Sequence, residues 1–457
     1  MITSINDFKS PFFIGVAGVG MSAIAQYLKG IGKNVSGSDR FFAPGVYNDV
    51  QDKLEAANIK CFVQDGSGIG QDTDLIVVST AIEDTVNEVK KAKELGIPIV
   101  RRSELLSIIA QSKKTIAVGG TSGKSTTSAM LFEILEYAKL DASIISGAGL
   151  TRIIKKGQIG NAKVGKGDWL VIEADESDGS IVQYKPDIGL LLNIDKDHQD
   201  LEELMQIFTV FKSNSEKFIV NRSHPLAQSL SQNEQQDFST NGDKVGYVAT
   251  DFKQEGFTIE FAINAVPFTL KAMGRHNMEN ALAATAVAHH IGVSLQTCAA
   301  ALKEYEGIYR RNQILGNKNG VWLIDDYAHN PVKCAAAIAS VQPLADKVIA
   351  WFQPHGYKPT KFLREEFVKE FAKTLRPQDE LWMSEIYYAG GTAVKDISAN
   401  DLINDLKQLG NNAYYEENRA NFVKAIRSHL SSNCVVLLMA ARDPSLAQYA
   451  KDVWDEL

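Results

Sequence analysis

The sequence predicts an α/β protein with three domains, each built around a largely parallel sheet. The chain has 457 residues, and at about 150 residues per domain this length suggests roughly three domains. Short apolar runs alternate with helical patterns along the chain, and such alternation is typical of parallel sheets with crossover helices. Glycine-rich turns follow two of the expected strands, near residues 18 and 120. We expect a Rossmann-like N-terminal domain over residues 1–110, a central P-loop domain with a parallel sheet over 111–310, and a Rossmann-like C-terminal domain over 311–457.

The first domain begins with an apolar run and continues as alternating strands and helices. Residues 12–16 form a short run bounded by turn residues, which indicates a buried strand. Residues 87–96 have helical spacing and end at a glycine, a common residue after the last helical turn. We expect strands at 12–16, 34–39, 75–79 and 97–100, and helices at 21–31 and 87–96.

The second and third domains repeat this alternation, with one polar interruption. Residues 222–270 are polar with short alternating runs, such as Thr258–Ile263, which predicts antiparallel β structure. For the second domain we expect strands at 115–118, 168–173 and 188–193 and helices at 128–137 and 280–290. For the third domain we expect strands at 321–326, 348–352, 380–383 and 434–439.

Composition and charge exclude several classes of protein. Hydrophobic residues make up 45% of the chain and charged residues 23%, which is typical of globular proteins and argues against disorder. The net charge of −7 provides no overall basic field for nucleic acid. The apolar run Val435–Ala441 is far shorter than the roughly 20 residues that span a bilayer. The first residues lack the pattern of a secretory signal, so we expect a soluble cytoplasmic protein with no membrane, nucleic-acid or obligate protein partner.

The first glycine-rich turn fits a dinucleotide-binding pattern. Residues Gly18–Ala23 match G-x-G-x-x-G/A after an expected strand, and Asp39 follows about 20 residues later. These glycines let a helix N-terminus approach a diphosphate, and the carboxylate can accept from a ribose or a base. NAD satisfies this pattern, and so does a UDP-sugar. The alternative is a tight turn that binds nothing.

The second glycine-rich turn predicts a phosphate loop. Residues Gly119–Thr127 lie between an expected strand and an expected helix and contain Gly-Lys-Ser-Thr. In such loops backbone N–H groups surround phosphates, the lysine reaches the outer phosphates, and the next hydroxyl binds Mg²⁺. The strict Walker spacing is not met, because Val118 stands where the first glycine of that motif belongs. A solvated lysine on a glycine turn is the alternative.

Acidic residues follow two further strands of the second domain. Residues 173–178 end one expected strand, and residues 193–198 end the next. Ligands of open parallel sheets bind beyond the carboxyl ends of the strands, so both groups should converge on the phosphate loop. Oxygen ligands beside a triphosphate suit Mg²⁺, whereas one histidine does not by itself indicate zinc. The alternative is that each acid is a solvated strand end.

Taken in order, these motifs resemble the Mur ligase family over essentially the whole chain. The segments that carry the resemblance are Gly120–Thr126, Glu173–Ser180, Asn193–Asp195 with Asp197–His198, Gly274–Asn280, Arg310–Arg311, Asp325–Pro331 and Gln353–His355. The resemblance implies an ATP-dependent ligase of peptidoglycan synthesis, which forms an amide between the carboxylate of UDP-N-acetylmuramic acid and an amino acid through an acyl phosphate. Within the family, Gly18–Ser22 and Ser36–Asp39 are similar to members that add L-alanine.

The resemblance also assigns roles to individual residues, with ATP and Mg²⁺ as cofactors. The residues expected at ATP are Gly120, Thr121, Ser122, Gly123, Lys124, Ser125, Thr126, Asn277, Asn280, Arg311 and Asp325. The expected metal ligands are Ser125, Glu173 and His198. The residues expected at the UDP moiety are Gly15, Gly18, Val19, Gly20, Met21, Ser38 and Asp39. Those expected at the amino acid are Tyr327, His329, His355 and Lys358. The expected catalytic residues are Lys124, Glu173, His198, Arg311, Asp326 and His329, with the choice between Asp325 and Asp326 left open.

Three departures from the family pattern fall in the expected amino-acid-binding domain. Gly356 and Pro359 stand where two arginines are usual, and no acid follows Tyr388-Ala389-Gly390. The segment Ala440–Asp443 has Arg442 in place of the usual glycine. These changes leave open a family member that uses another amine, peptide or related acceptor. Two further alternatives are an NAD-dependent oxidoreductase and a nucleotide-binding protein without catalytic activity.

Overall fold

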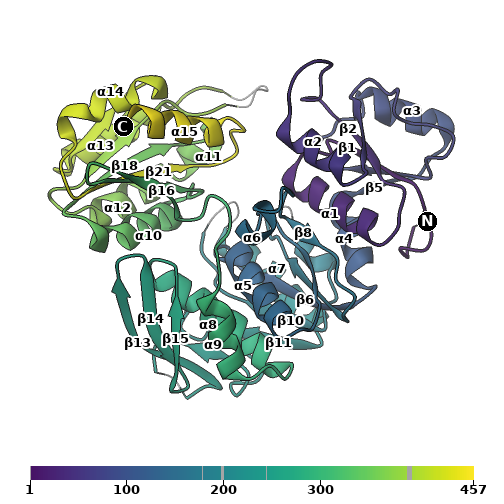
Figure 1. Ribbon diagram of the computed structural model, residues 1–457, viewed down its shortest axis with the longest axis horizontal. Coiled ribbons are helices and arrows are strands. Elements are labelled where there is room, and N and C mark those ends of the chain that lie inside the picture. The colour runs from purple at the N-terminus through teal and green to yellow at the C-terminus, as the bar shows by residue number, and fades with distance from the viewer. Residues whose placement is uncertain (1, 178, 197–199, 243, 389–393) are drawn as a thin grey trace. The chain divides into compact units, whose positions relative to one another are not determined.

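The protein is described by a computed structural model over residues 2–177, 179–196, 200–242, 244–388 and 394–457, and within these residues it forms four sheets (Figure 1). The chain divides into two compact units. The first comprises Met1–Thr250, Ala262–Phe268 and Glu279–Ile308, and the second comprises Asp251–Phe261, Thr269–Met278 and Tyr309–Leu457. The expected α/β class with parallel sheets is confirmed. In the described part of the chain, no helix is long and apolar enough to cross a membrane.

The first sheet is parallel and belongs to the first unit. Its strands run in the order β3 (Lys60–Val63), β2 (Ser36–Asp39), β1 (Pro11–Ile14), β4 (Leu75–Val78) and β5 (Ile99–Arg101). Its helices are α1 (Val19–Gly30), α2 (Asp49–Ala56), α3 (Asn87–Leu95) and α4 (Arg102–Ala110). Strand β3 was not predicted, because it is an edge strand whose residues are exposed or only half-buried and give a weak apolar signal.

The second sheet also belongs to the first unit. Its order is β11 (Lys217–Val220), β10 (Ile188–Leu191), β6 (Lys114–Gly119), β9 (Trp169–Glu173), β7 (Ser143–Ile145) and β8 (Ala162–Lys163), with β8 antiparallel. The helices that follow its strands or pack near them are α5 (Lys124–Tyr137), α6 (Thr151–Ile154), α7 (Leu201–Asn214), α8 (Arg275–His290) and α9 (Leu295–Lys303). Helix α5 begins before the expected residue 128, so Lys124 and Ser125 lie in its first turn.

The first two sheets share one hydrophobic core. Buried residues of α1 and α4, such as Ile24 and Leu105, belong to the same cluster as Leu170 and Phe208 of the second sheet's layer. Polar contacts add to this packing, since Gln26 Nε2 donates to Asn161 Oδ1 at 2.7 Å. The first glycine-rich turn and the phosphate loop therefore belong to the same compact unit.

The polar segment forms a four-stranded sheet. Its order is β12 (Phe238–Ser239), β13 (Tyr247–Glu255), β14 (Thr258–Ile263) and β15 (Val266–Leu270). Asn264 and Ala265 both have positive φ, at 47° and 66°, which is the backbone of a two-residue hairpin turn. The expectation of antiparallel structure needs one correction, because β12 pairs with β13 in parallel.

The last sheet belongs to the second unit. Its order is β16 (Gln313–Lys318), β17 (Val321–Asp326), β21 (Cys434–Ala440), β18 (Lys347–Gln353), β19 (Glu380–Met383) and β20 (Ala413–Tyr415), and only β16 is antiparallel to its neighbour. One face packs against α10 (Pro331–Val341), α12 (Arg364–Thr374) and α13 (Ala399–Gln408). The other face packs against α14 (Phe422–Ile426) and α15 (Leu446–Glu456). Strand β21 therefore lies in the middle of the sheet, between β17 and β18.

Candidate active site

The phosphate loop lies at the carboxyl end of β6, between β10 and β9. Residue Gly120 has φ of +134°, a backbone region that L side chains rarely adopt. A Cβ there would lie 3.0 Å from Leu192 Cβ and 3.2 Å from Asn193 N. Glycine is therefore required both by the backbone conformation and by the close approach of the segment that follows β10.

Asn193 holds the loop from the neighbouring strand. Its Oδ1 accepts from Ser122 N at 2.8 Å and from Thr121 Oγ1 at 2.9 Å. Asp195 N donates to the same Thr121 hydroxyl at 3.0 Å. The structure thus brings the segment after β10 against the phosphate loop, because β10 and β6 are adjacent parallel strands.

Lys124 is held in place by two carboxylates and a carbonyl. Its Nζ donates to Gly120 O at 2.7 Å and to Glu176 Oε2 at 2.6 Å, and lies 3.8 Å from Asp175 Oδ1. Burial by itself would lower the pKa of Lys124, but the charges of Glu176 and Asp175 outweigh it and raise the pKa. The lysine is therefore charged and fixed beside the loop. The sequence showed these two acids only as part of a strand-end cluster, not as partners of the lysine.

Ser125 and Glu173 form the oxygen pair expected at a metal. Ser125 Oγ donates to Glu173 Oε2 at 2.9 Å. The other carboxylate oxygen, Oε1, accepts from Ser146 Oγ at 2.7 Å and from Gly147 N at 2.6 Å. A hydroxyl and a carboxylate fit Mg²⁺, which takes few protein ligands and fills its shell with water and phosphate oxygens.

The third residue expected to bind the metal is His198. His198 lies outside the described residues. Among the residues that the structure does describe, no group of three or more histidine, cysteine, aspartate or glutamate side chains could hold a metal. The donors present fit a cation shared with a phosphate ligand better than a site made by the protein alone.

Asn277 and Asn280, both expected at ATP, lie in different surroundings. Asn280 Oδ1 accepts from Thr127 Oγ1 at 3.2 Å, and a Cβ on Gly123 would lie 2.5 Å from it, so Asn280 lies against the phosphate loop. Asn277 belongs to the second unit, where its Nδ2 donates to Met273 O at 2.7 Å. Thr126, the last residue of the expected loop, lies in the first turn of α5.

The N-terminal turn is ordered by Asp39. Its two carboxylate oxygens accept from Ala17 N and Phe41 N, both at 3.0 Å. Gly15, with φ of +82°, donates its N–H to Ser38 O at 2.7 Å. Asp39 is expected to accept a hydrogen bond from a ligand, and in the structure it also orders the backbone of the turn before α1.

The remaining residues of this turn start the first helix. Gly18 precedes α1, and Val19, Gly20 and Met21 form its first turn. In the described part of the chain, the buried hydroxyl of Ser38 has no hydrogen-bond partner.

Arg102 is a cation that the sequence reasoning missed. A Cβ on Gly20 would lie 2.9 Å from its Nη1, so its guanidinium lies beside the start of α1. The pKa of Asp175 is lowered even though burial by itself would raise it. Lys124 is the main cause of the lowering, and Arg102 adds to it. Helix α4, which carries Arg102, was not predicted; the basic pair Arg101-Arg102 directly after an expected strand was the available signal.

The carboxyl edge of the last sheet carries two buried aspartates. Arg310 binds Asp325 through Nε at 2.7 Å and Nη2 at 3.1 Å, and Nη2 also donates to Ala440 O at 3.1 Å. Asp326 accepts from the N–H groups of Asn312 at 2.6 Å and Ala328 at 2.7 Å. Burial raises the pKa of Asp326, although Arg311 opposes this. Both acids therefore hold the loops at this edge.

Three aromatic side chains meet at the same edge. The ring of Tyr327 lies 4.9 Å from the Arg311 guanidinium and 5.5 Å from the His329 ring. The rings of His329 and His355 are 5.5 Å apart, which brings together the loops after β17 and β18. Burial lowers the pKa of His329 well below its usual range, so the ring is neutral. Lys358 is exposed on α11 (Tyr357–Phe362).

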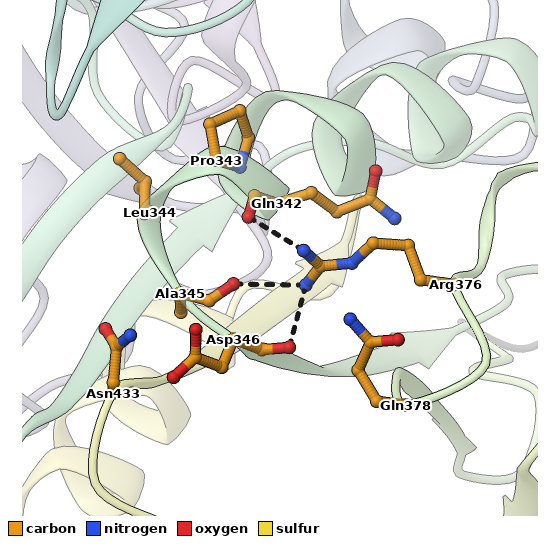
Figure 2. A pocket seen from close by; sticks show the side chains of 8 residues that line it. All are labelled: Gln342, Pro343, Leu344, Ala345, Asp346, Arg376, Gln378 and Asn433. Atoms are coloured by element: carbon orange, nitrogen blue, oxygen red, sulfur yellow. Dashed lines mark hydrogen bonds between the residues drawn. The ribbon is translucent and has the colours of Figure 1, made fainter.

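A hollow of about 410 Å³ lies at the opposite, amino end of this sheet (Figure 2). The Arg376 guanidinium enters it and donates to the carbonyls of Gln342, Ala345 and Asp346 at 3.1 to 3.3 Å. It also forms an ion pair with Asp379 at 2.9 Å. Arg376 therefore stabilises the loops at this end of the sheet. The hollow lies at the end opposite to the edge that carries His329 and His355.

A strand, a glycine-containing loop and a helix, flanked by two strands that end in polar side chains, define a P-loop α/β protein. Sequence comparison matches residues 12–114 to the Mur ligase family catalytic domain. It matches residues 118–288 to the Mur ligase middle domain and 310–442 to the Mur ligase glutamate ligase domain. The chain belongs to the Mur ligase family, and the resemblance drawn from its motifs is confirmed.

Several relatives are similar over nearly the full length. A UDP-N-acetylmuramate–L-alanine ligase of Carboxydothermus hydrogenoformans is 36% identical over 446 residues, covering 94% of this chain and 93% of the relative. The enzyme of the same name from Pelotomaculum thermopropionicum is 32% identical, with 94% of each chain covered. The crystal structure of a UDP-N-acetylmuramate–alanine ligase from Thermotoga maritima has a TM-score of 0.79 at 24% identity and 98% coverage of both chains, which confirms the fold.

Proposed function

We propose that this chain is an ATP-dependent ligase that forms the amide bond between the carboxylate of UDP-N-acetylmuramic acid and L-alanine, in peptidoglycan synthesis. The observation that carries this proposal is the fixed arrangement of Lys124, Ser125 and Glu173 around the phosphate loop. The names of the full-length relatives supply the two substrates. The glycine motif at Gly18 then serves a UDP-sugar, and the NAD-dependent oxidoreductase loses its support.

The chemistry requires activation of a carboxylate, which is a poor electrophile. ATP transfers its γ-phosphoryl group to the carboxylate, which gives an acyl phosphate and ADP. The neutral amine then attacks the acyl carbonyl, and the C–O bond to phosphate breaks with release of inorganic phosphate. Lys124 and the N–H groups at the start of α5 offset phosphate charge. Ser125 and Glu173, with His198, would hold Mg²⁺, which would offset further phosphate charge. The proposed ATP residues further include Gly120, Thr121, Ser122, Gly123, Thr126, Asn277, Asn280, Arg311 and Asp325.

The flanking domains supply the two other substrates in this proposal. Residues 1–110 hold the UDP moiety through Gly15, Gly18, Val19, Gly20, Met21, Ser38 and Asp39, and 111–310 bind ATP. Residues 311–457 hold the amino acid through Tyr327, His329, His355 and Lys358, with Asp326 beside them. Burial keeps the pKa of His329 low, so its ring is neutral. Its Nδ1 lies 2.9 Å from Tyr327 O, which leaves Nε2 to accept a hydrogen bond from the neutral, attacking amine.

The test is ADP release with Mg-ATP, UDP-N-acetylmuramic acid and a panel of amino acids and short peptides. Turnover that requires both the sugar nucleotide and L-alanine supports the proposal. Nucleotide binding with no acceptor-dependent turnover would favour a binding protein without catalytic activity and would overturn it.

A second candidate differs only in the amine. Gly356, with φ of +74°, and Pro359 stand where two arginines are usual in the members that add L-alanine, so the pocket for the amino acid is altered. Turnover in the same panel with another amino acid or a peptide, and none with L-alanine, would identify this alternative.

A further inference from the structure

Three non-glycine residues at the carboxyl edge of the last sheet have left-handed backbone: Arg310 at φ 56°, Asn312 at 46° and Arg442 at 66°. Such conformations are costly for residues with a side chain and persist where other interactions or a function require them. Two of the three are explained by their contacts. The Arg310 guanidinium binds Asp325, and Asn312 N donates to Asp326.

Arg442 is the unexplained residue. It is exposed, and within the described residues no hydrogen bond, ion pair or ring contact engages its guanidinium. A glycine would adopt this backbone without strain, and its neighbour Asp443 is already held by Arg419 and by Ser445 N at 2.9 Å. The turn itself therefore does not require an arginine.

The strand order places Arg442 at the same edge of the sheet as the proposed amine site. Strand β21 lies between β17 and β18, with Met439 in register with Asp326 and Ala440 with Gln353. Arg442 thus follows the end of the middle strand. The loops on either side carry His329 and His355, whose rings approach to 5.5 Å.

Three other cations of this domain are already paired with carboxylates. Arg310 is paired with Asp325 at 2.7 Å, Arg419 with Asp443, and Lys361 with Asp396. The incoming amino acid is a zwitterion, so its carboxylate needs a cation when the amine is held near the reacting carbonyl. A guanidinium matches a carboxylate through two parallel hydrogen bonds.

We propose that Arg442 binds the α-carboxylate of the incoming amino acid and thereby selects amines that carry a free carboxylate. This inference rests on the proposed function. It predicts that Arg442 acts on amine binding and has no part in the binding of ATP or of the sugar nucleotide.

The test compares Arg442→Gly with the wild-type enzyme on two amines, L-alanine and L-alaninamide, which lacks the carboxylate charge. We expect the KM for L-alanine to rise roughly 10- to 100-fold, the range of a lost charge-assisted hydrogen bond. The KM values for ATP and L-alaninamide should stay unchanged, and Arg442→Lys should restore part of the loss. The matched control is Asn433→Gly. Asn433 also has a left-handed backbone conformation, with φ of 62°, but it lies at the amino end of the same strand.

The outcomes separate a binding role from a structural one. Because glycine relieves strain, Arg442→Gly should unfold at the same or a higher denaturant concentration than wild type. An unchanged KM for L-alanine, or an equal loss with both amines, would overturn the inference alone. A wild-type enzyme that turns over neither amine would instead overturn the proposed function, and the inference with it.

Discussion

The phosphate-loop edge of the second sheet and the carboxyl edge of the last sheet are built in different ways. Both lie at the carboxyl ends of parallel strands, where open α/β sheets bind ligands. At the first edge, one contiguous motif supplies the loop and the helix start, and Asn193 and Glu173 hold it from the adjacent strands. At the last edge, the side chains come from loops after three separate strands. In the proposed function, phosphate recognition would therefore depend on backbone shape, and amine recognition on side chains gathered from distant segments.

The two regions also differ in the charge of their buried side chains. At the phosphate loop, Glu176 and Asp175 keep the buried Lys124 charged. In the second unit, burial keeps two imidazoles neutral. It lowers the pKa of His276, in the first turn of α8, to about 4, and that of His329, at the last edge, well below its usual range. In the proposed function, the first edge would bind anionic phosphates, and the last edge would hold a neutral imidazole beside the incoming amine.

The largest effect is expected at Lys124. Lys124→Ala should reduce ADP formation by about 10³-fold, because it removes the cation that opposes phosphate charge in a fixed site. Binding of the UDP substrate, measured by calorimetry, should persist. Lys114→Ala, an exposed lysine at the opposite end of β6, is the control. ADP formation at the wild-type rate in Lys124→Ala would contradict the role of the loop.

The next effect is on stability at the last edge. Arg310→Met leaves the buried Asp325 carboxylate without its partner, which should lower the free energy of unfolding by about 3–5 kcal/mol. The control is Arg364→Met, which breaks a similar two-bonded pair with Asp405 that is partly exposed to water. It should cost less than about 1 kcal/mol. Tryptophan fluorescence in urea follows this region, because four of the five tryptophans lie beyond residue 320. Equal losses would contradict the distinction.

The comparison also explains what the sequence could predict. The phosphate loop, the strand that ends at Glu173 and the strand before Asn193 were predicted because each is a contiguous pattern at the end of an apolar run. The partners of Lys124 were missed, because the pairing with Glu176 depends on how the loop after β9 turns back over the lysine. Arg102 was missed because α4 and the packing of α1 against it are tertiary features. Strands β16 and β20 were missed as edge strands that are only partly buried.

The two buried imidazoles predict an acid-sensitive second unit. A base whose folded pKa is depressed binds fewer protons than the unfolded chain, so stability is lost as pH falls below the unfolded pKa. For His276, a shift from 6.5 to about 4 means a loss of about 2 kcal/mol between pH 7 and pH 5. His276→Gln should reduce this pH dependence, measured by urea unfolding at both pH values. The exposed His289→Gln is the control, and an unchanged slope in His276→Gln would contradict the prediction.

The smallest effect tests whether the phosphate loop depends on backbone shape. Gly120 and Gly157 both have positive φ, at 134° and 79°, but a Cβ at Gly157 meets nothing within 4 Å, whereas one at Gly120 meets Leu192 and Asn193. Gly157→Ala should therefore cost only the backbone strain, about 1 kcal/mol, and Gly120→Ala about 1 kcal/mol more, because its neighbours must move. Thermal unfolding of the two variants measures the difference. Only Gly120→Ala should also slow ADP formation, since the displaced segment after β10 holds Thr121 and Ser122. Equal effects at the two glycines would mean that the loop relaxes around a methyl group. Phosphate binding would then depend on side chains, as proposed for amine binding at the last sheet.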